Sequence, residues 1–202
     1  MPEAVSGPGV SRFFAARLRN LLLAFGALAC LGAAPVRADA PNSASPSRTP
    51  DYRQIIATSQ AAIGRPLADI RMRDSNGKEV RFSDYQGRPL LISLVYTGCF
   101  QACPVATQFL AEAVREARRA LGDDRFTVVS IGFNQPFDSP SAMAAFKRQN
   151  RIVEPGWHFL SPDPAQVDAL TANLGFVYEA TPKGFDHVTQ VTIVDADGVI
   201  YR

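Results

Sequence analysis

Two cysteines four residues apart carry the most recognisable chemistry in this sequence. Cys99 and Cys103 enclose the tripeptide Phe-Gln-Ala, and Pro104 follows directly. Residues i and i+4 share one face of a helix, so both sulfur atoms can converge on one point. Such a pair can close a local disulfide, exchange thiols with another disulfide, or bind a soft metal ion. The shorter C-x-x-C spacing is more typical of dithiol exchange, but spacing alone leaves all three open.

The sequence around the cysteines predicts a junction between a strand and a helix. Residues 90–96 form an apolar run that is typical of a strand buried on both faces, and Pro104 suits the first turn of a helix. Binding sites in open α/β sheets lie at this carboxyl edge, and a helix N-terminus lowers the pKa of a thiol. A disulfide closing so short a loop would constrain the unfolded chain little. The junction therefore favours reactive cysteines over a purely structural disulfide.

The rest of the chain alternates between predicted strands and helices. Strands are expected at residues 70–74, 80–82, 126–133, 157–160, 191–194 and 199–201, and helices from Pro104 onward and at residues 138–146 and 164–174. This alternation indicates an α/β fold with a central mixed sheet flanked by helices. The helix after the cysteines has apolar residues at helical spacing, which we expect to form its buried face: Val105, Phe109, Ala113, Ala117 and Leu121.

A histidine is the third candidate ligand. His187 follows Asp186 at the end of a predicted loop over residues 181–186, ahead of the predicted strand at 191–194. In a thioredoxin-like sheet, the loop before that strand faces the helix start that carries the cysteines. Two thiolates and one imidazole select Cu(I) and tolerate Cu(II), whereas zinc normally takes four protein ligands or an open catalytic position. His158 lies within a predicted strand, where we expect a packed residue and not a ligand.

Composition and charge exclude some classes of function. The chain has 202 residues with a formal net charge of +2, and 47% of its residues are hydrophobic. An apolar fraction of this size allows a packed core. A nearly balanced charge without a basic stripe argues against binding to nucleic acid. The sequence also contains no motif for a small-molecule substrate.

The first 38 residues predict an export signal. Arg12, Arg17 and Arg19 precede an apolar stretch at 21–34, and Val36-Arg37-Ala38 offers a cleavage site. We expect a signal peptide at 1–38, a flexible linker rich in proline and serine at 39–62, and one thioredoxin-like domain at 63–202, located in the periplasm or cell envelope. An uncleaved segment that tethers the protein to the membrane is the alternative, although the stretch is shorter than the roughly 20 residues of a membrane span. A further alternative uses Cys30 as a lipidated N-terminus.

These motifs together resemble the Sco (SenC) family of copper-handling thioredoxin-like proteins. The resemblance extends from Ile63 to the end of the chain and is carried by LVYTGCFQACP at 94–104, Asp186-His187, and VDADG at 194–198. It implies that Cys99, Cys103 and His187 bind copper, Cu(I) or Cu(II). It also implies delivery of copper to, or reduction of the cysteines of, the binuclear copper centre of a respiratory cytochrome c oxidase. The implied partners are the copper-receiving oxidase subunit, another copper chaperone, or a thioredoxin-like reductant.

A further acidic residue enters through the same resemblance. Family members carry an acidic residue in a D-T-P segment, and Asp138-Ser139-Pro140 is similar. We expect Asp138 to lie beside the copper ligands without binding the metal. The alternative is that Asp138 only caps the helix that follows it.

Two features depart from the family pattern. Residues 100–102 are apolar or neutral, where family members usually have proline and acidic residues, and the sequence given ends at Arg202, directly after a predicted strand begins. A thioredoxin-like domain normally adds a final helix. We therefore expect either a truncated chain or another cover for one face of the sheet.

Other thiol chemistries remain as alternative functions. A thiol–disulfide oxidoreductase of the cell envelope is the first of them, but such enzymes place a cis-proline before the late strand, where this chain has Val188-Thr189-Gln190. A peroxidase of the peroxiredoxin type has a threonine three residues before its cysteine, whereas Thr97 stands two before Cys99. We therefore expect a metallochaperone rather than a turnover enzyme.

Overall fold

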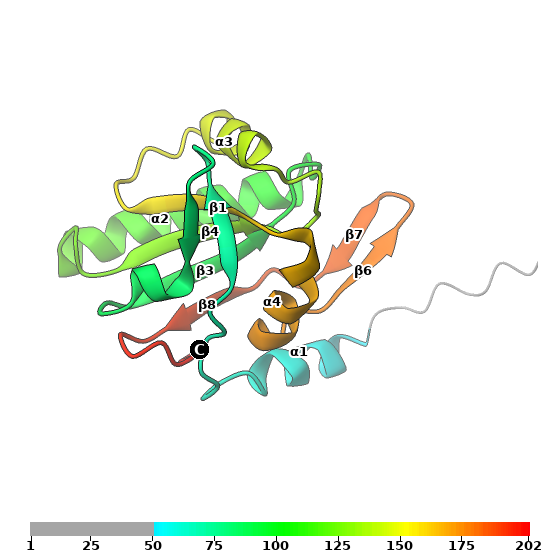
Figure 1. Ribbon diagram of the computed structural model, residues 1–202, viewed down its shortest axis with the longest axis horizontal. Helices are drawn as coiled ribbons and strands as arrows, with labels where there is room; N and C mark the ends of the chain where they lie inside the picture. Colours follow the sequence, from blue (N-terminus) through cyan, green and yellow to red (C-terminus); the bar gives the residue numbers. More distant parts are fainter. Residues whose placement is uncertain (1–50) are drawn as a thin grey trace, which may run out of the picture. The chain divides into compact units, whose positions relative to one another are not determined.

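The computed structural model describes residues 51–202, so the predicted signal peptide and the first half of the predicted linker, residues 39–50, lie outside the described residues. The described part contains four helices, a six-stranded sheet and a two-stranded hairpin (Figure 1). In chain order the elements are α1 (Tyr52–Gln60), β1 (Arg71–Asp74), β2 (Glu79–Arg81), β3 (Leu90–Val95), α2 (Ala102–Leu121), β4 (Thr127–Gly132), α3 (Pro140–Gln149), β5 (Trp157–Pro162), α4 (Val167–Leu174), β6 (Tyr178–Thr181), β7 (Gly184–His187) and β8 (Val191–Val194), with short 3₁₀ turns at Phe82–Tyr85 and Pro164–Gln166.

The large sheet is mixed, as the sequence predicts. Its strand order is β2-β1-β5-β4-β3-β8, with β3, β4 and β5 parallel and the remaining neighbours antiparallel. Every residue of the central strand β4 is buried. A strand covered on both faces has this character, because it needs apolar side chains in both directions.

Helices α2 and α3 cover the same face of this sheet. A line of hydrogen bonds crosses that face: the Ser93 and Ser130 hydroxyls are 2.8 Å apart, and the Trp157 indole donates to Ser130 at 3.0 Å. The Phe146 ring of α3 packs on Phe159 of β5. These bonds satisfy the polar groups that the close approach of the helices removes from water.

The buried face of α2 differs from the predicted one. Val105, Phe109 and Leu121 are exposed, with 52%, 68% and 63% of their surface accessible. The buried residues of α2 are Cys103, Thr107, Ala111, Val114 and Arg118. Small side chains such as Ala111 allow the helix backbone to approach the sheet, and this requirement outweighs the placement of the largest apolar residues.

The two ends of the described part consist of a capped helix and a hairpin. Helix α1 occupies a part of the chain that we expected to be flexible linker; Asp51 caps it, and none of its residues is buried. The predicted final hairpin is confirmed, because the Tyr201 amide donates to the Ile193 carbonyl at 2.8 Å and the Asp195 amide donates to the Val199 carbonyl at 2.9 Å. Within residues 51–202, no helix is long and apolar enough to cross a bilayer.

Candidate thiol and metal site

The two cysteines meet at the carboxyl end of β3, where α2 begins. The Cys103 amide donates a hydrogen bond to the Cys99 sulfur at 3.2 Å, and the Cys99 amide donates to the Tyr96 carbonyl at 3.1 Å. Cys99 precedes α2, so its sulfur reaches Cys103 by capping the first turn and not by sharing a helical face. Both side chains are free thiols; Cys99 is half-buried, whereas Cys103 is 4% exposed.

The two thiols differ in acidity. Burial raises the pKa of Cys99, but hydrogen bonds from the Cys103 and Gln101 amides, the Cys103 thiol and the Tyr96 hydroxyl outweigh it, so the pKa is lowered. Burial raises the pKa of Cys103 to about 12, and the charges of Cys99 and Asp138 add to this shift. Sequence reasoning expected the helix N-terminus to make both cysteines reactive thiolates. In the structure, only Cys99 has a lowered pKa, whereas the pKa of Cys103 is raised.

Tyr96 joins the cysteines to the hairpin of β6 and β7. Its ring packs edge-on against Phe185, with ring centres 5.1 Å apart, and burial together with the neighbouring Cys99 raises the pKa of its hydroxyl. The Tyr96 hydroxyl packs against the backbone of Gly184, because a Cβ atom at residue 184 would lie only 2.5 Å from the hydroxyl oxygen. Gly184 has a φ of +123°, which side chains rarely adopt, so glycine is required here on two grounds.

His187 lies at the end of that hairpin, and the prediction of a loop over residues 181–186 is wrong. Strands β6 and β7 pair antiparallel, with Tyr178 opposite His187. The His187 ring packs among the aromatic rings of Phe133, Phe176 and Tyr96, and its Nδ1 lies 3.2 Å from the Val188 carbonyl. This aromatic surrounding orients the imidazole on a paired strand and not on a free loop.

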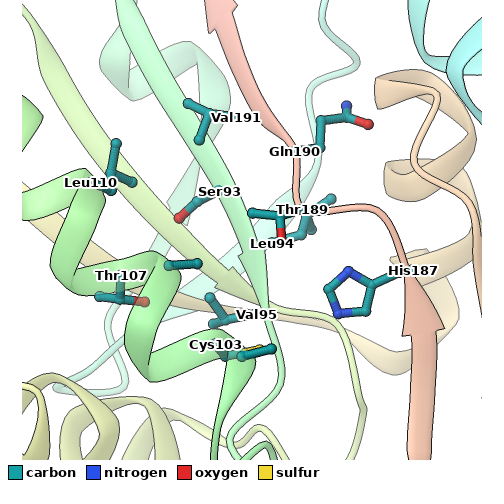
Figure 2. A pocket seen from close by; sticks show the side chains of 12 residues that line it. Ser93, Leu94, Val95, Cys103, Thr107, Leu110, His187, Thr189, Gln190 and Val191 are labelled. Carbon is teal, nitrogen blue, oxygen red and sulfur yellow. The ribbon is translucent and has the colours of Figure 1, made fainter.

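His187 and Cys103 line one groove between β3, α2 and the segment that leads into β8. Figure 2 shows the imidazole on the β7 side of this groove and Cys103 on the α2 side. The walls between them are largely apolar and include Leu94, Val95 and Val191. The expectation that His187 faces the start of the cysteine helix agrees with this placement.

The three predicted ligands are nevertheless not gathered into a single cluster. Among residues 51–202, no three histidine, cysteine or acidic side chains lie close enough together to share a metal ion. The structure brings Cys99 and Cys103 together, and it places His187 across the groove from Cys103. The three-ligand copper site therefore stays a prediction.

Asp138 is fully buried and holds the loop that carries Cys99. Its carboxylate accepts hydrogen bonds from the Thr97 amide at 2.8 Å, the Thr97 hydroxyl at 2.7 Å and the Asn134 amide at 2.8 Å. Burial raises the pKa of Asp138, although these hydrogen bonds partly oppose the shift. The space for the carboxylate exists because Gly132 has no side chain, since a Cβ atom there would overlap Asp138.

The helix-cap alternative for Asp138 is wrong. Ser139 is the N-cap of α3, and its hydroxyl accepts a hydrogen bond from the Ala142 amide. Pro140 then occupies the first turn, as the helix start requires. Asp138 is thus free to act on the cysteine loop through Thr97.

Sequence reasoning missed Tyr96 and underestimated Thr97. Tyr96 ends the apolar run before the cysteines, so the sequence pattern predicts a core residue there. The signal for a role at the site is its hydroxyl group, three residues before Cys99. Thr97 was noted only for its spacing, while its hydrogen bonds to Asp138 depend on a contact between residues 41 apart in sequence.

His158, expected to be packed, lies outside the groove. It stands on β5, and its ring centre is 5.3 Å from that of Tyr85. Burial lowers its pKa, and the charge of Lys147 adds to the shift. Nothing at this position connects it with the cysteines.

Comparisons with known proteins show the family and the fold of this chain. The SCO1/SenC family matches residues 61–202. A search of curated proteins found no match. Among solved structures, the chain is similar to a putative electron transfer protein from Aquifex aeolicus VF5, with 24% identity, 69% of this chain and 82% of that chain covered, and a TM-score of 0.61.

Two further structures are informative. ScoI from Bradyrhizobium japonicum, solved with copper bound, is 25% identical over 69% of this chain and 87% of that chain, with a TM-score of 0.59. The thioredoxin domain of a thiol-disulfide oxidoreductase from Bacteroides vulgatus is 15% identical over 69% of this chain and 85% of that chain, with a TM-score of 0.51. The second likeness shows the thioredoxin-like fold alone. Because the family match covers most of the chain and includes the whole cysteine and histidine region, this protein belongs to the SCO1/SenC family.

Proposed function

We propose that this protein is a copper metallochaperone that binds copper through Cys99, Cys103 and His187. It would deliver copper to, or reduce the cysteines of, the binuclear copper centre of a respiratory cytochrome c oxidase. The observation that carries the proposal is the contact between a Cys99 thiol of lowered pKa and the Cys103 amide, with His187 on the wall of the groove that Cys103 lines. Family membership supports it, because a similar protein, ScoI, is known with copper bound.

The donor set suits copper in type and protonation. Thiolates are the preferred ligands of Cu(I), and Cys99 is the thiol that the structure makes acidic. Cys103 has a pKa of about 12, so it must lose its proton when the metal binds. Copper binding should therefore release a proton from Cys103 at neutral pH.

A three-ligand site also requires His187 to approach the sulfur atoms. His187 lies on a two-stranded hairpin that is separate from the large sheet, so the imidazole can shift without breaking the sheet's hydrogen bonds. The close packing of the Tyr96 hydroxyl against Gly184 limits this shift, because the hairpin cannot move closer to Tyr96 without a steric clash.

The test is an anaerobic Cu(I) titration of the reduced chain, with Cys30→Ser throughout to remove the remaining thiol. We expect one copper ion per chain, and affinity reduced at least about tenfold, or about 1.4 kcal/mol, by His187→Ala or Cys103→Ser. His158→Ala is the matched control, because His158 is the only other histidine of the chain. Unchanged affinity in His187→Ala would remove the histidine from the site and contradict the three-ligand proposal.

A thiol–disulfide oxidoreductase of the cell envelope is the second candidate. The asymmetry of the thiols favours it: Cys99 would attack a partner disulfide, and Cys103 would then attack the resulting mixed disulfide and release the partner's second thiol. Two electrons pass from the cysteine pair to the partner, and Cys99–Cys103 becomes a disulfide. This function would stand first if the metal-free protein reduced insulin with turnover, with dithiothreitol supplied to regenerate the cysteine pair, and if a separate titration showed weak Cu(I) binding.

The partners and location follow from the same proposal. The copper-receiving subunit of the oxidase is the expected acceptor, with another copper chaperone or a thioredoxin-like reductant as further partners. We propose that residues 1–38 direct the chain to the periplasm or cell envelope. Fractionation of cells that express the full chain, with mass spectrometry of its N-terminus, distinguishes cleavage near residue 38 from a retained membrane tether.

A further inference from the structure

Two strongly exposed phenylalanines stand beside the cysteine loop. Phe100 directly follows Cys99 and is 95% exposed, while Phe137 directly precedes Asp138 and is 72% exposed. They lie in the loops after β3 and β4, which pair in parallel and end at the same edge of the sheet (Figure 1). The hydrogen bonds from Thr97 to Asp138 join these two loops. Exposed aromatic residues in loops that carry a reactive group are typical of an interaction surface.

The same loops contain no accessible charge. Residues 89–111 and 126–137 include no acidic or basic side chain, although 20% of the whole sequence is charged. The neighbouring charged residue, Asp138, is fully buried. A partner with a charged surface would lose hydration here without gaining an ion pair, whereas an apolar surface would be complementary.

The chemistry at Cys99 determines what covers this surface. Sulfur forms bonds of about 2.0 Å to another sulfur and about 2.3 Å to a metal, so a reacting partner must bring its own ligand into direct contact with Cys99. Because Cys103 is buried, the approach is over Cys99 and its exposed neighbour Phe100. The residues that flank the partner's cysteine must then lie on the adjacent side chains.

We propose that Phe100 and Phe137 form a docking surface for an uncharged, apolar polypeptide segment that flanks the reactive cysteine of the partner. This rests on the proposed function, since it assumes that a partner reacts at Cys99. The docking surface adds the chemical class of the partner to that proposal. The partner should carry apolar residues next to the cysteine that exchanges copper or electrons with Cys99. Association through this surface should also be insensitive to salt, because it contains no accessible charge.

The test uses two synthetic peptides, each with one cysteine activated as a 2-pyridyl disulfide. In one peptide leucine and phenylalanine flank the cysteine, and in the other aspartate and lysine do. The Cys99 thiolate attacks the peptide sulfur, forms a mixed disulfide and releases 2-thiopyridone, which is measured by absorbance. The full chain carries Cys30→Ser and Cys103→Ser, so that Cys99 is the only thiol and the mixed disulfide persists.

Each rate is divided by the rate of the same variant with 4,4′-dithiodipyridine, which reports the intrinsic reactivity of Cys99. We expect the apolar peptide to react about tenfold faster than the charged one, and Phe100→Ser with Phe137→Ser to reduce this preference to about twofold. Val153→Ser is the matched control, because Val153 is 85% exposed at a distant surface, and it should keep the full preference. The preference should persist from low salt to about 0.5 M NaCl.

Three outcomes would overturn the proposal. Equal rates for both peptides would show that the surface does not select apolar segments, and an unchanged preference in the double variant would place the selection elsewhere. A dimer that the double variant dissociates, with peptide rates unchanged, would assign the surface to contacts between copies of this chain. Failure of the proposed function is seen separately, in the titration of the Cys30→Ser chain that keeps Cys103. It would appear as absence of Cu(I) binding there while the peptide selectivity remains.

Discussion

The carboxylate of Asp138 holds Thr97 twice, through its backbone amide at 2.8 Å and its hydroxyl at 2.7 Å. Both bonds go to the same oxygen, and the second oxygen accepts from the Asn134 amide. Asp138 therefore connects the loop after β4 with the turn before Cys99. A buried carboxylate with three donors orders this loop, because any displacement leaves the charge without partners.

Replacement of Asp138 by asparagine should destabilise the fold. The amide nitrogen of Asn cannot accept hydrogen bonds, so either the Thr97 donors or the Asn134 amide would lose their acceptor. The free energy of unfolding should fall by about 1–3 kcal/mol. Urea unfolding with an unchanged slope would measure this loss. Asp123→Asn, at an exposed position in the turn after α2, should change stability by less than about 0.5 kcal/mol. Equal stability of the two variants would show that the contacts to Thr97 do not matter.

The Asp138 variant should also change the dependence of stability on pH. Because the folded pKa of Asp138 is raised, the folded state holds its proton more tightly than the unfolded state. This contribution to stability is present in acid and is lost as pH rises from the ordinary value near 3.8 through the folded pKa. The stability difference between the wild type and Asp138→Asn should therefore shrink as pH rises through this window. A stability difference that grows as pH rises would contradict a raised pKa for Asp138 in the folded state.

The two thiols should react at different pH. Cys99, whose pKa is lowered, should be alkylated by iodoacetamide at a pH below the ordinary range for a thiol, whereas Cys103, with a pKa of about 12, should stay unmodified at neutral pH. Peptide mass mapping after timed alkylation of the Cys30→Ser chain gives both rates. Equal rates, or faster modification of Cys103, would contradict the assignment of Cys99 as the attacking thiol.

Tyr96→Phe should make Cys99 less acidic. The variant removes a hydroxyl whose hydrogen bond favours the thiolate, so the pKa of Cys99 should rise and alkylation near neutral pH should slow by about twofold or more. Tyr85→Phe is the control, because Tyr85 is half-buried beside His158 and far from the cysteines in the fold. An unchanged pH profile in Tyr96→Phe would limit Tyr96 to a packing role.

Gly184→Ala should displace the hairpin that carries His187. Its Cβ atom would lie 2.5 Å from the Tyr96 hydroxyl, at a φ of +123°. Gly77→Ala shares the positive φ, at +83°, but meets nothing within 4 Å, so it isolates the backbone cost of about 1–2 kcal/mol. We expect Gly184→Ala to be less stable than Gly77→Ala and to weaken Cu(I) binding, as titration would show. Equal effects of both variants would show that the contact with Tyr96 is dispensable.

Several elements could be predicted from the sequence because their causes are local. The apolar run before Cys99 identifies β3, and the Asp74–Gly77 turn signal identifies the hairpin of β1 and β2. The buried face of α2 could not be predicted, because it depends on how closely the helix approaches the sheet. The hairpin of β6 and β7 could not be predicted for a similar reason: Gly184 is needed there because a Cβ atom would overlap Tyr96, which lies far away in sequence.

The sequence by itself determined that two cysteines stand at a strand–helix junction, and that a histidine follows at position 187. Residue types and their spacing carry this information without tertiary contacts. Only the tertiary structure decided which thiol is the reactive one, because the pKa of a thiol depends on its burial and on the donors around it. The tertiary structure likewise gave Asp138 its role, since the contact with Thr97 exists only when β3 and β4 lie side by side.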